Sequence, residues 1–170
     1  MYWYNKSSDL RASAAALWKS TEKDIAKQIV EDSGLGVGFL MGVAVGPVYH
    51  MLCGMAMELI LKALIVEKGG DVNKSSHDLL LHLSASGIAY PNKERELLKI
   101  LSHAITWAGR YPTPKKEIHM DDYKNLVREN LYDRVPLGTF TALKPNDALD
   151  WESFNGMWSK AMNEYFDSKV

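Results

Sequence analysis

The stretch from Val48 to Lys68, VYHMLCGMAMELILKALIVEK, limits the fold of this chain more than any other. Between Pro47, which suits a first helical turn, and Gly69-Gly70, it predicts one helix that is apolar over most of its surface. A helix of that kind is normally buried within a bundle. Glu58 and Lys62 lie one turn apart on it, in the favourable order for an ion pair, and charges buried without partners are costly. We therefore predict a central helix with an important polar interior face; an ordinary surface ion pair is the alternative.

Periodic apolar residues and capping residues predict a bundle around this helix. The chain has 170 residues, 46% of them hydrophobic and 24% charged, which suits one domain, residues 1–170, with a hydrophobic core. The predicted fold class is all-α, a single-domain bundle of about five to six helices. Residues 135–149, which contain Pro136 and Gly138, are predicted to be a connection. A first helix is expected over 8–31, capped by Ser8 or Asp9. A short helix should follow a capping box of Ser75 and Asp78 and end at about Ser86, and the next should run from Pro91 through Gly109. Two more helices should begin at Asp121 or Asp122 and at Asp147 or Asp150, the last of them with a heavy aromatic stripe.

Residues 33–47, SGLGVGFLMGVAVGP, form a glycine-rich segment ahead of the central helix. Gly34-x-Gly36 invites comparison with a phosphate-binding loop, but Phe39 stands where the dinucleotide fingerprint has its third glycine. No Gly-Lys-Ser/Thr sequence follows, and no strand is predicted before it. We therefore predict either a flexible joint or a backbone that packs closely against a neighbour.

The same region has some features of a membrane span. The 23 residues from Leu35 to Met57 contain no Asp, Glu, Lys or Arg, and Gly38, Gly42 and Gly46 form a small-residue stripe of the kind found in packed membrane helices. Two features argue against a membrane span. The stretch contains five glycines, a proline and a histidine, and its flanks lack the Lys/Arg cluster that would set the orientation of a helix in the membrane. We expect a protein that does not contact a membrane.

Charge and cysteine content narrow the function classes. A net charge of -1 argues against binding along an extended phosphate backbone, although a local basic strip is compatible with it. Cys53 is the single cysteine and lies in the apolar helix, so we expect a reducing cytoplasm; the N-terminal residues lack the pattern of a secretory signal.

His77 and His82, five apart, do not share a helix face, and no HExxH motif occurs. We expect neither a metal nor another cofactor.

Three short motifs carry a resemblance to a known family. The central helix contains Met57-Glu58-Leu59-Ile60-Leu61-Lys62-Ala63-Leu64; a glycine break and then His77-Asp78-Leu79 follow; the next helix ends in Trp107-Ala108-Gly109-Arg110-Tyr111-Pro112. In this order and spacing, over roughly residues 47–114, the chain resembles the HEPN superfamily of prokaryotic helical-bundle proteins.

The resemblance implies a bundle of four to five helices, often a homodimer, with nucleotide or RNA as the ligand class. Many members are metal-independent RNA endonucleases of toxin–antitoxin or defence systems, in which a neighbouring gene supplies a partner protein. Those nucleases carry an Arg followed, after four to six residues, by a His, because a fixed cation can hold phosphate while an imidazole moves a proton. No arginine here has a histidine at that distance; Arg95, with seven residues before His103, comes nearest. The resemblance therefore favours a binding module.

Polar residues of these motifs are the candidate site. Glu58, Lys62, His77, Asp78 and Arg110 match recurring polar positions of the family, and we predict that they converge in one place. No catalytic residue is assigned. The full set of ligand-binding candidates is Glu58, Lys62, His77, Asp78, His103, Arg110 and Tyr111.

Alternatives remain open for several of these residues. Arg110 either projects into a cleft or satisfies the last carbonyls of its helix, and His103 is either a core group or a ligand. A divergent RNA endonuclease would use His77 or His103 as base or acid and Arg110 for the transition-state charge. In a third alternative the polar set is a buried salt-bridge network of a structural dimer, with the aromatic last helix as the dimer surface.

Overall fold

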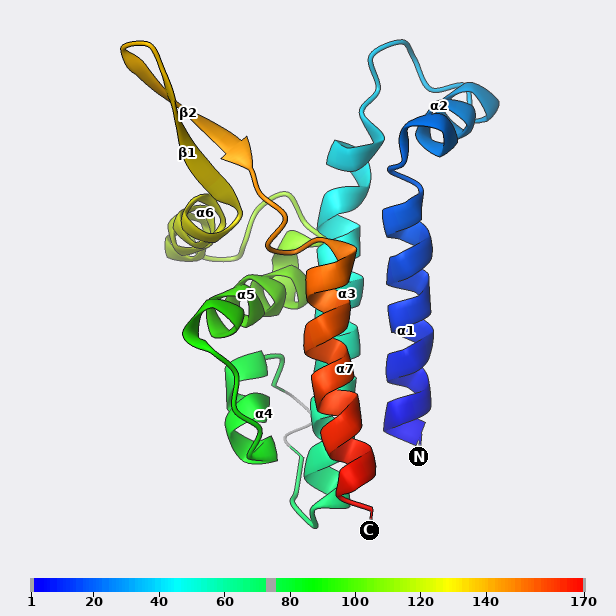
Figure 1. Cartoon of the computed structure of the whole chain (residues 1–170), viewed down its shortest axis with the longest axis vertical. Helices are drawn as coiled ribbons and strands as arrows, with labels where there is room; N and C mark the ends of the chain where they lie inside the picture. Colours follow the sequence, from blue (N-terminus) through cyan, green and yellow to red (C-terminus); the bar gives the residue numbers. More distant parts are fainter. Residues whose placement is uncertain (1, 73–75, 170) are drawn as a thin grey trace.

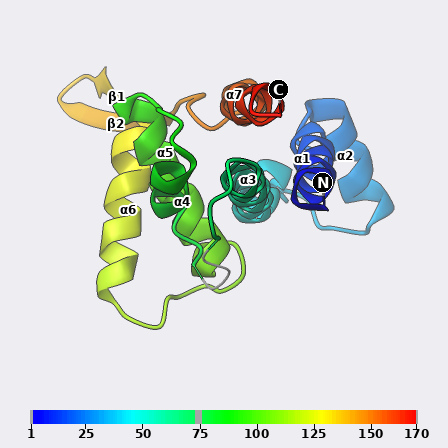
Figure 2. The same cartoon turned by 90° about the horizontal axis from the view of Figure 1, so that it is seen from below.

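The computed structural model describes residues 2–72 and 76–169, which are mostly helical with one small two-stranded hairpin. Helix α3 runs along the long axis and contacts α1, α4, α5, η1 and α7 (Figure 1). Viewed end-on in Figure 2, these elements surround α3 on three sides, which confirms the predicted central helix. In chain order the elements are α1 (Tyr2–Lys19), α2 (Lys23–Asp32), α3 (Met41–Glu67), α4 (Leu79–Ser86), α5 (Asn92–His103), the π-helical η1 (Ala104–Ala108), α6 (Ile118–Asn130), β1 (Tyr132–Leu137), β2 (Phe140–Pro145) and α7 (Trp151–Asp167).

Helix α3 ends where predicted but begins earlier. Gly69 adopts φ 78° just after its last turn, the left-handed conformation that glycine takes without strain. At the other end the expectation for Pro47 was wrong, because α3 begins at Met41 and Pro47 lies inside it. The carbonyl of Leu40 already accepts the first backbone N–H bonds, and a helix can continue past a proline at the loss of one such bond.

Hydrogen bonds through Ser7 tie α1, α3 and α7 together. The Ser7 hydroxyl, fully buried, donates to the Ala56 carbonyl at 2.7 Å and accepts the Trp158 indole N–H at 2.7 Å. Around it α7 buries Phe154 and Tyr165 against the core, so the predicted docking of its aromatic stripe is confirmed. Most of the stripe is therefore covered within the chain, whereas Phe166 is 44% exposed, and the alternative in which this helix forms a dimer surface stays a prediction.

Helix α5 crosses α3 at close range. A Cβ added at Gly54 would lie 2.7 Å from Ile105 Cγ1 and 2.9 Å from the Leu101 carbonyl oxygen, so only glycine allows this approach. The predicted helix from Pro91 to Gly109 is present, but its last part is the π-helical η1, in which the Gly109 N–H bonds the Ala104 carbonyl.

The predicted helix over 8–31 is wrong, because the chain forms α1 and α2 with a break between them. At the break the Ser20 and Thr21 hydroxyls donate to the carbonyls of Leu17 and Trp18, at 2.6 and 2.7 Å. Those carbonyls are the acceptors that a continuing helix would use, and serine and threonine side chains compete for them.

The capping predictions have mixed outcomes. Asp78 caps α4 by accepting from the Leu80 and Leu81 N–H groups, whereas its proposed box partner Ser75 lies outside the described residues. Asp150, rather than Asp147, caps α7. Ser8 and Asp9 cap nothing, since both lie inside α1.

The predicted connection over 135–149 is wrong, because most of it belongs to the antiparallel hairpin β1–β2. Leu137 pairs with Phe140 across a two-residue turn in which Gly138 has φ 61°, as hairpin turns require. Pro136 is tolerated because both strands are edges. The chain is therefore mostly helical with a hairpin, not all-α.

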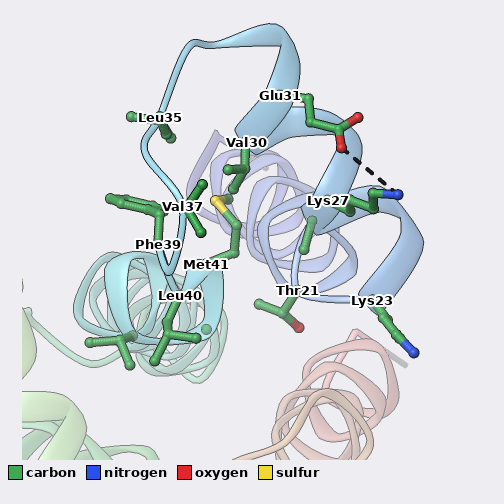
Figure 3. A pocket seen from close by; sticks show the side chains of 13 residues that line it. Thr21, Lys23, Lys27, Val30, Glu31, Leu35, Val37, Phe39, Leu40 and Met41 are labelled. Carbon is green, nitrogen blue, oxygen red and sulfur yellow. Dashed lines mark ion pairs between the residues drawn. The ribbon is translucent and has the colours of Figure 1, made fainter.

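Residues 33–40 of the glycine-rich segment link α2 to α3, and residues 41–47 form the start of α3. No atom lies within 4 Å of an added Cβ at any of its five glycines, so the close-packing alternative is wrong. Figure 3 shows the apolar groove of about 700 Å³ that this segment forms with α2, closed on one side by the Lys27–Glu31 ion pair. Val37 and Leu40 are strongly exposed beside it.

Among the described residues, α3 is the one helix whose length and composition would allow it to cross a membrane. Of its most apolar 18-residue window, 67% is buried inside the protein, as the middle helix of a bundle requires. The lone cysteine, Cys53, is free and buried within it.

Two glycine substitutions should have opposite effects on stability. Gly54→Ala places a methyl group against Leu101 and Ile105 and should lower the free energy of unfolding by about 2 kcal/mol. Gly156→Ala, in α7 with open space around it, should raise that free energy by about 0.5–1 kcal/mol through helix propensity. Urea titrations measure both. Equal effects of the two variants would contradict the close crossing of α5 over α3.

Candidate functional site

The buried carboxylate of Glu58 joins two other candidate residues. Lys62 Nζ donates to Glu58 Oε1 at 2.5 Å, and His77 Nδ1 lies 2.9 Å from Glu58 Oε2. Glu58 and Lys62 are only 6% and 2% exposed, so the predicted interior pair is confirmed and the surface pair is excluded. The Lys62 ammonium also lies over the Trp3 ring, 5.8 Å from its centroid. Both carboxylate oxygens thus have partners, which makes the burial tolerable.

The network fixes the orientation of His77. Because an ionised carboxylate only accepts hydrogen bonds, His77 Nδ1 carries the proton that Glu58 receives. The other ring nitrogen, Nε2, remains for a further partner, and the side chain is 46% exposed. A buried charge pair therefore holds an accessible imidazole in one tautomer, as carboxylates do for histidines in catalytic and metal sites.

His77 lies on the rim of a hollow of about 410 Å³ between the start of α4, η1 and the start of α6. A second hollow of about 540 Å³ shares Asp78, Ser102 and His103 with it and continues along α6. Three histidines from three different segments meet at the first hollow. Its lining residues are Ser76, His77, Asp78, Ser102, His103, Thr106, Trp107 and His119.

His103 is not a fully buried core group, and its role as a ligand stays a prediction. It is half-buried, with its ring 5.7 Å from that of Tyr123, and its Nδ1 accepts the Trp107 indole N–H at 3.3 Å. Nε2 is therefore the protonated nitrogen of the neutral ring. Burial, and next the charge of His119, lower the pKa of His103, against an opposing effect of Asp122. At pH 7 this imidazole is a neutral hydrogen-bond donor in the wall of the hollow.

The predicted convergence of five residues is wrong for Arg110. Its Nη2 donates to the Thr106 carbonyl at 2.7 Å, and its guanidinium lies 5.4 Å from the ring centre of Tyr111. Both side chains are exposed and outside the hollow. The cause is local, since the carbonyls at the end of η1 need donors and Arg110 is the first long cation after them.

Asp78 reaches the hollow without joining the charge pair. Its carboxylate accepts from the Leu80 N–H at 2.9 Å as the cap of α4. Ser102 braces the same helix start, because its hydroxyl accepts the Leu79 N–H at 3.0 Å. These bonds position the segment that carries His77.

Sequence reasoning missed Ser102, Thr106 and His119 as lining residues. Ser102 and Thr106 carried a detectable signal, because they lie four apart, with His103 between them, and therefore share a helix face. His119 carried none, because α6 begins at Ile118 rather than at the predicted Asp121. Its place depends on how α6 packs beside α5.

Among residues 2–72 and 76–169, no three His, Cys, Asp or Glu side chains are placed to hold a metal ion. In comparisons with known proteins, the chain matched no protein-family model, no curated protein and no solved structure. The HEPN resemblance therefore rests on the sequence motifs.

Removing one member of the buried network should be strongly destabilising. Glu58→Gln leaves Lys62 without a counter-charge and should lower the free energy of unfolding by about 3 kcal/mol, whereas Glu58→Leu with Lys62→Met should recover most of that loss. Glu96→Gln, in the half-exposed Lys99–Glu96 pair, is the matched control and should change it by less than about 1 kcal/mol. Equal urea midpoints for the two Gln variants would refute the importance of the network.

Proposed function

We propose that this chain is a HEPN-like helical-bundle protein that binds a nucleotide or a short piece of RNA in the hollow lined by His77, His103 and His119. One observation carries the proposal: Glu58, already neutralised by Lys62, fixes His77 at the rim, where Nε2 has no partner among residues 2–72 and 76–169. A buried ion pair that holds an exposed imidazole prepares that imidazole for a polar ligand.

The charges around the hollow favour a small ligand. Among the described residues, Asp78, Asp122 and Glu129 line the two adjoining hollows together with one Lys or Arg, namely Lys99. This balance repels a long phosphate backbone, whose binding depends on many Lys and Arg contacts. A nucleotide or a few unpaired bases can instead use directed hydrogen bonds from imidazoles, with His103 as donor and His77 as acceptor.

The wider role that we propose follows from the motif resemblance. The protein would act in the cytoplasm within a prokaryotic toxin–antitoxin or defence system, as a homodimer or with a partner protein from a neighbouring gene. The mostly helical body and the buried Glu58–Lys62 pair are compatible with such a module. The absence of the family's Arg/His nuclease spacing supports binding as the main activity.

Calorimetry with a panel of nucleotides and short RNAs at low salt tests binding. The unmodified protein should bind at least one of them, and His77→Ala should weaken binding about tenfold, the effect of one strong hydrogen bond. Arg110→Ala is the control, because Arg110 is engaged with the Thr106 carbonyl and should leave affinity unchanged. Absence of binding to the whole panel would favour the alternative of a structural bundle with a buried salt-bridge network.

A divergent RNA endonuclease is the second candidate, favoured by the Glu58–His77 dyad. In this mechanism His77 Nε2 accepts the proton of a ribose 2′-hydroxyl, whose oxygen bonds to phosphorus. The bond from phosphorus to the 5′-oxygen breaks, and protonated His119 gives that oxygen its proton. The products are a 2′,3′-cyclic phosphate and a 5′-hydroxyl.

RNA cleavage in the presence of a metal chelator distinguishes this candidate from simple binding. If it is right, His77→Ala should reduce the cleavage rate by a factor of about 100 or more, as expected for the loss of a general base. Cleavage by Arg110→Ala should persist, since that side chain lies outside the hollow. RNA that stays intact at high protein concentration would exclude the nuclease while leaving the binding proposal standing.

A further inference from the structure

A second cleft, separate from the histidine hollow, lies along the first half of α3. Its volume is about 370 Å³, at the small end of the range for ligand pockets, and α1, α3, α6 and the segment before α7 form its walls. Four aromatic side chains, one each from α1, α3, α6 and β1, supply much of the lining: Trp18, Tyr49, Tyr123 and Tyr132. The rings of Trp18 and Tyr49 are 5.1 Å apart.

Two glycines keep this cleft open. Gly42 and Gly46 lie four apart on α3, both line the cleft, and no atom lies within 4 Å of a Cβ added at either. Neither has positive φ, so the backbone does not require glycine there. Their effect is to leave space on one face of the helix.

The Tyr49 hydroxyl is buried in this wall without a hydrogen-bond partner. Tyr49 is 2% exposed, and its closest polar neighbour is the Cys53 thiol, a weak partner that makes no hydrogen bond of ordinary geometry with it. Buried hydroxyls nearly always have partners in native proteins. Of the unpartnered buried polar atoms in the described part of the chain, which also include Glu94 Oε2 and the Tyr165 hydroxyl, only that of Tyr49 belongs to a residue of the cleft.

The remaining polar groups of the cleft are suited to an uncharged partner. His50 lies beside Tyr49 and makes no hydrogen bond within the described residues, and burial lowers its pKa to about 4, so its ring is neutral at pH 7. Within the described part of the chain, no Lys or Arg lines the cleft to attract an anion. The carboxylate of Asp150 already accepts the Ser153 N–H.

We propose that this cleft binds a small, neutral, planar heteroaromatic molecule, stacked among the aromatic side chains and hydrogen-bonded by Tyr49 and His50. Aromatic walls favour a flat ring by stacking, and the two neutral side chains select a ring that offers both a donor and an acceptor. The proposal is independent of ligand binding at the histidine hollow.

Four bicyclic probes test the proposal by NMR titration of the full chain. 7-Azaindole is neutral, with an N–H donor beside a ring-nitrogen acceptor; indole lacks the acceptor, N-methylquinolinium is a cation and indole-3-carboxylate an anion. The expected order places 7-azaindole first, about fivefold tighter than indole, which corresponds to one hydrogen bond. Shifted signals should map to Gly42, Gly46, His50 and Tyr132.

Two variants test whether binding depends on the cleft while the fold stays intact. Gly42→Leu fills the open space at the cleft and should abolish binding without lowering Tm, since leucine also favours the helix and no proline follows it. Tyr49→Phe removes only the unpartnered hydroxyl and should weaken 7-azaindole binding about fivefold. Tyr165→Phe is its matched control, because it removes another unpartnered buried hydroxyl away from the cleft and should leave binding unchanged.

Several outcomes would overturn the proposal. They are the absence of binding by every probe, tighter binding of the cation or the anion than of 7-azaindole, and binding that survives Gly42→Leu. Equal effects of Tyr49→Phe and Tyr165→Phe on affinity would also refute the role of the Tyr49 hydroxyl.

Discussion

The buried carboxylate of Glu58 is the interaction on which the rest of this structure depends. Helix α3 can occupy the middle of the bundle only if its charges are neutralised there, because an unpaired charge in the core is strongly destabilising. Lys62 supplies the counter-charge one turn along the same helix, and His77 supplies a donor from the segment before α4. One buried group thus stabilises the central helix, fastens a loop to it and orients an accessible imidazole.

The two ligand sites that we propose share a wall in α6. The Tyr123 ring lies 5.7 Å from that of His103 and 5.2 Å from that of Trp107, and the same residue lines the aromatic cleft along α3. Helix α6 buries no residue fully, so it is held less firmly than α3 or α7. A shift of this helix would change both sites together. The chemistry of the two differs, since polar and charged groups make up most of the lining of the hollows whereas aromatic side chains supply much of the lining of the cleft.

The sequence was most informative where a single local signal decided the structure. The apolar run around Glu58 predicted a buried central helix, and the glycine pair predicted its end, because burial and the left-handed cap are each dictated by residue type. It was least informative where weak signals competed. Apolar periodicity predicted one helix over 8–31, but the hydroxyls of Ser20 and Thr21 end the first helix there. The prolines at 136 and 145 led to the prediction of a connection, although Gly138 forms a hairpin turn between two strands.

By itself, the sequence determined that α3 is central and that Glu58 and Lys62, one turn apart on it, are a buried pair. These follow from hydrophobicity and from spacing along one helix, which are local properties. Only the tertiary structure decided that Arg110 turns to its own helix end, that His119 joins the hollow and that the glycines of α3 line an aromatic cleft. Those outcomes depend on how α6 and η1 pack against α3, and the contacts involved join residues far apart in the chain.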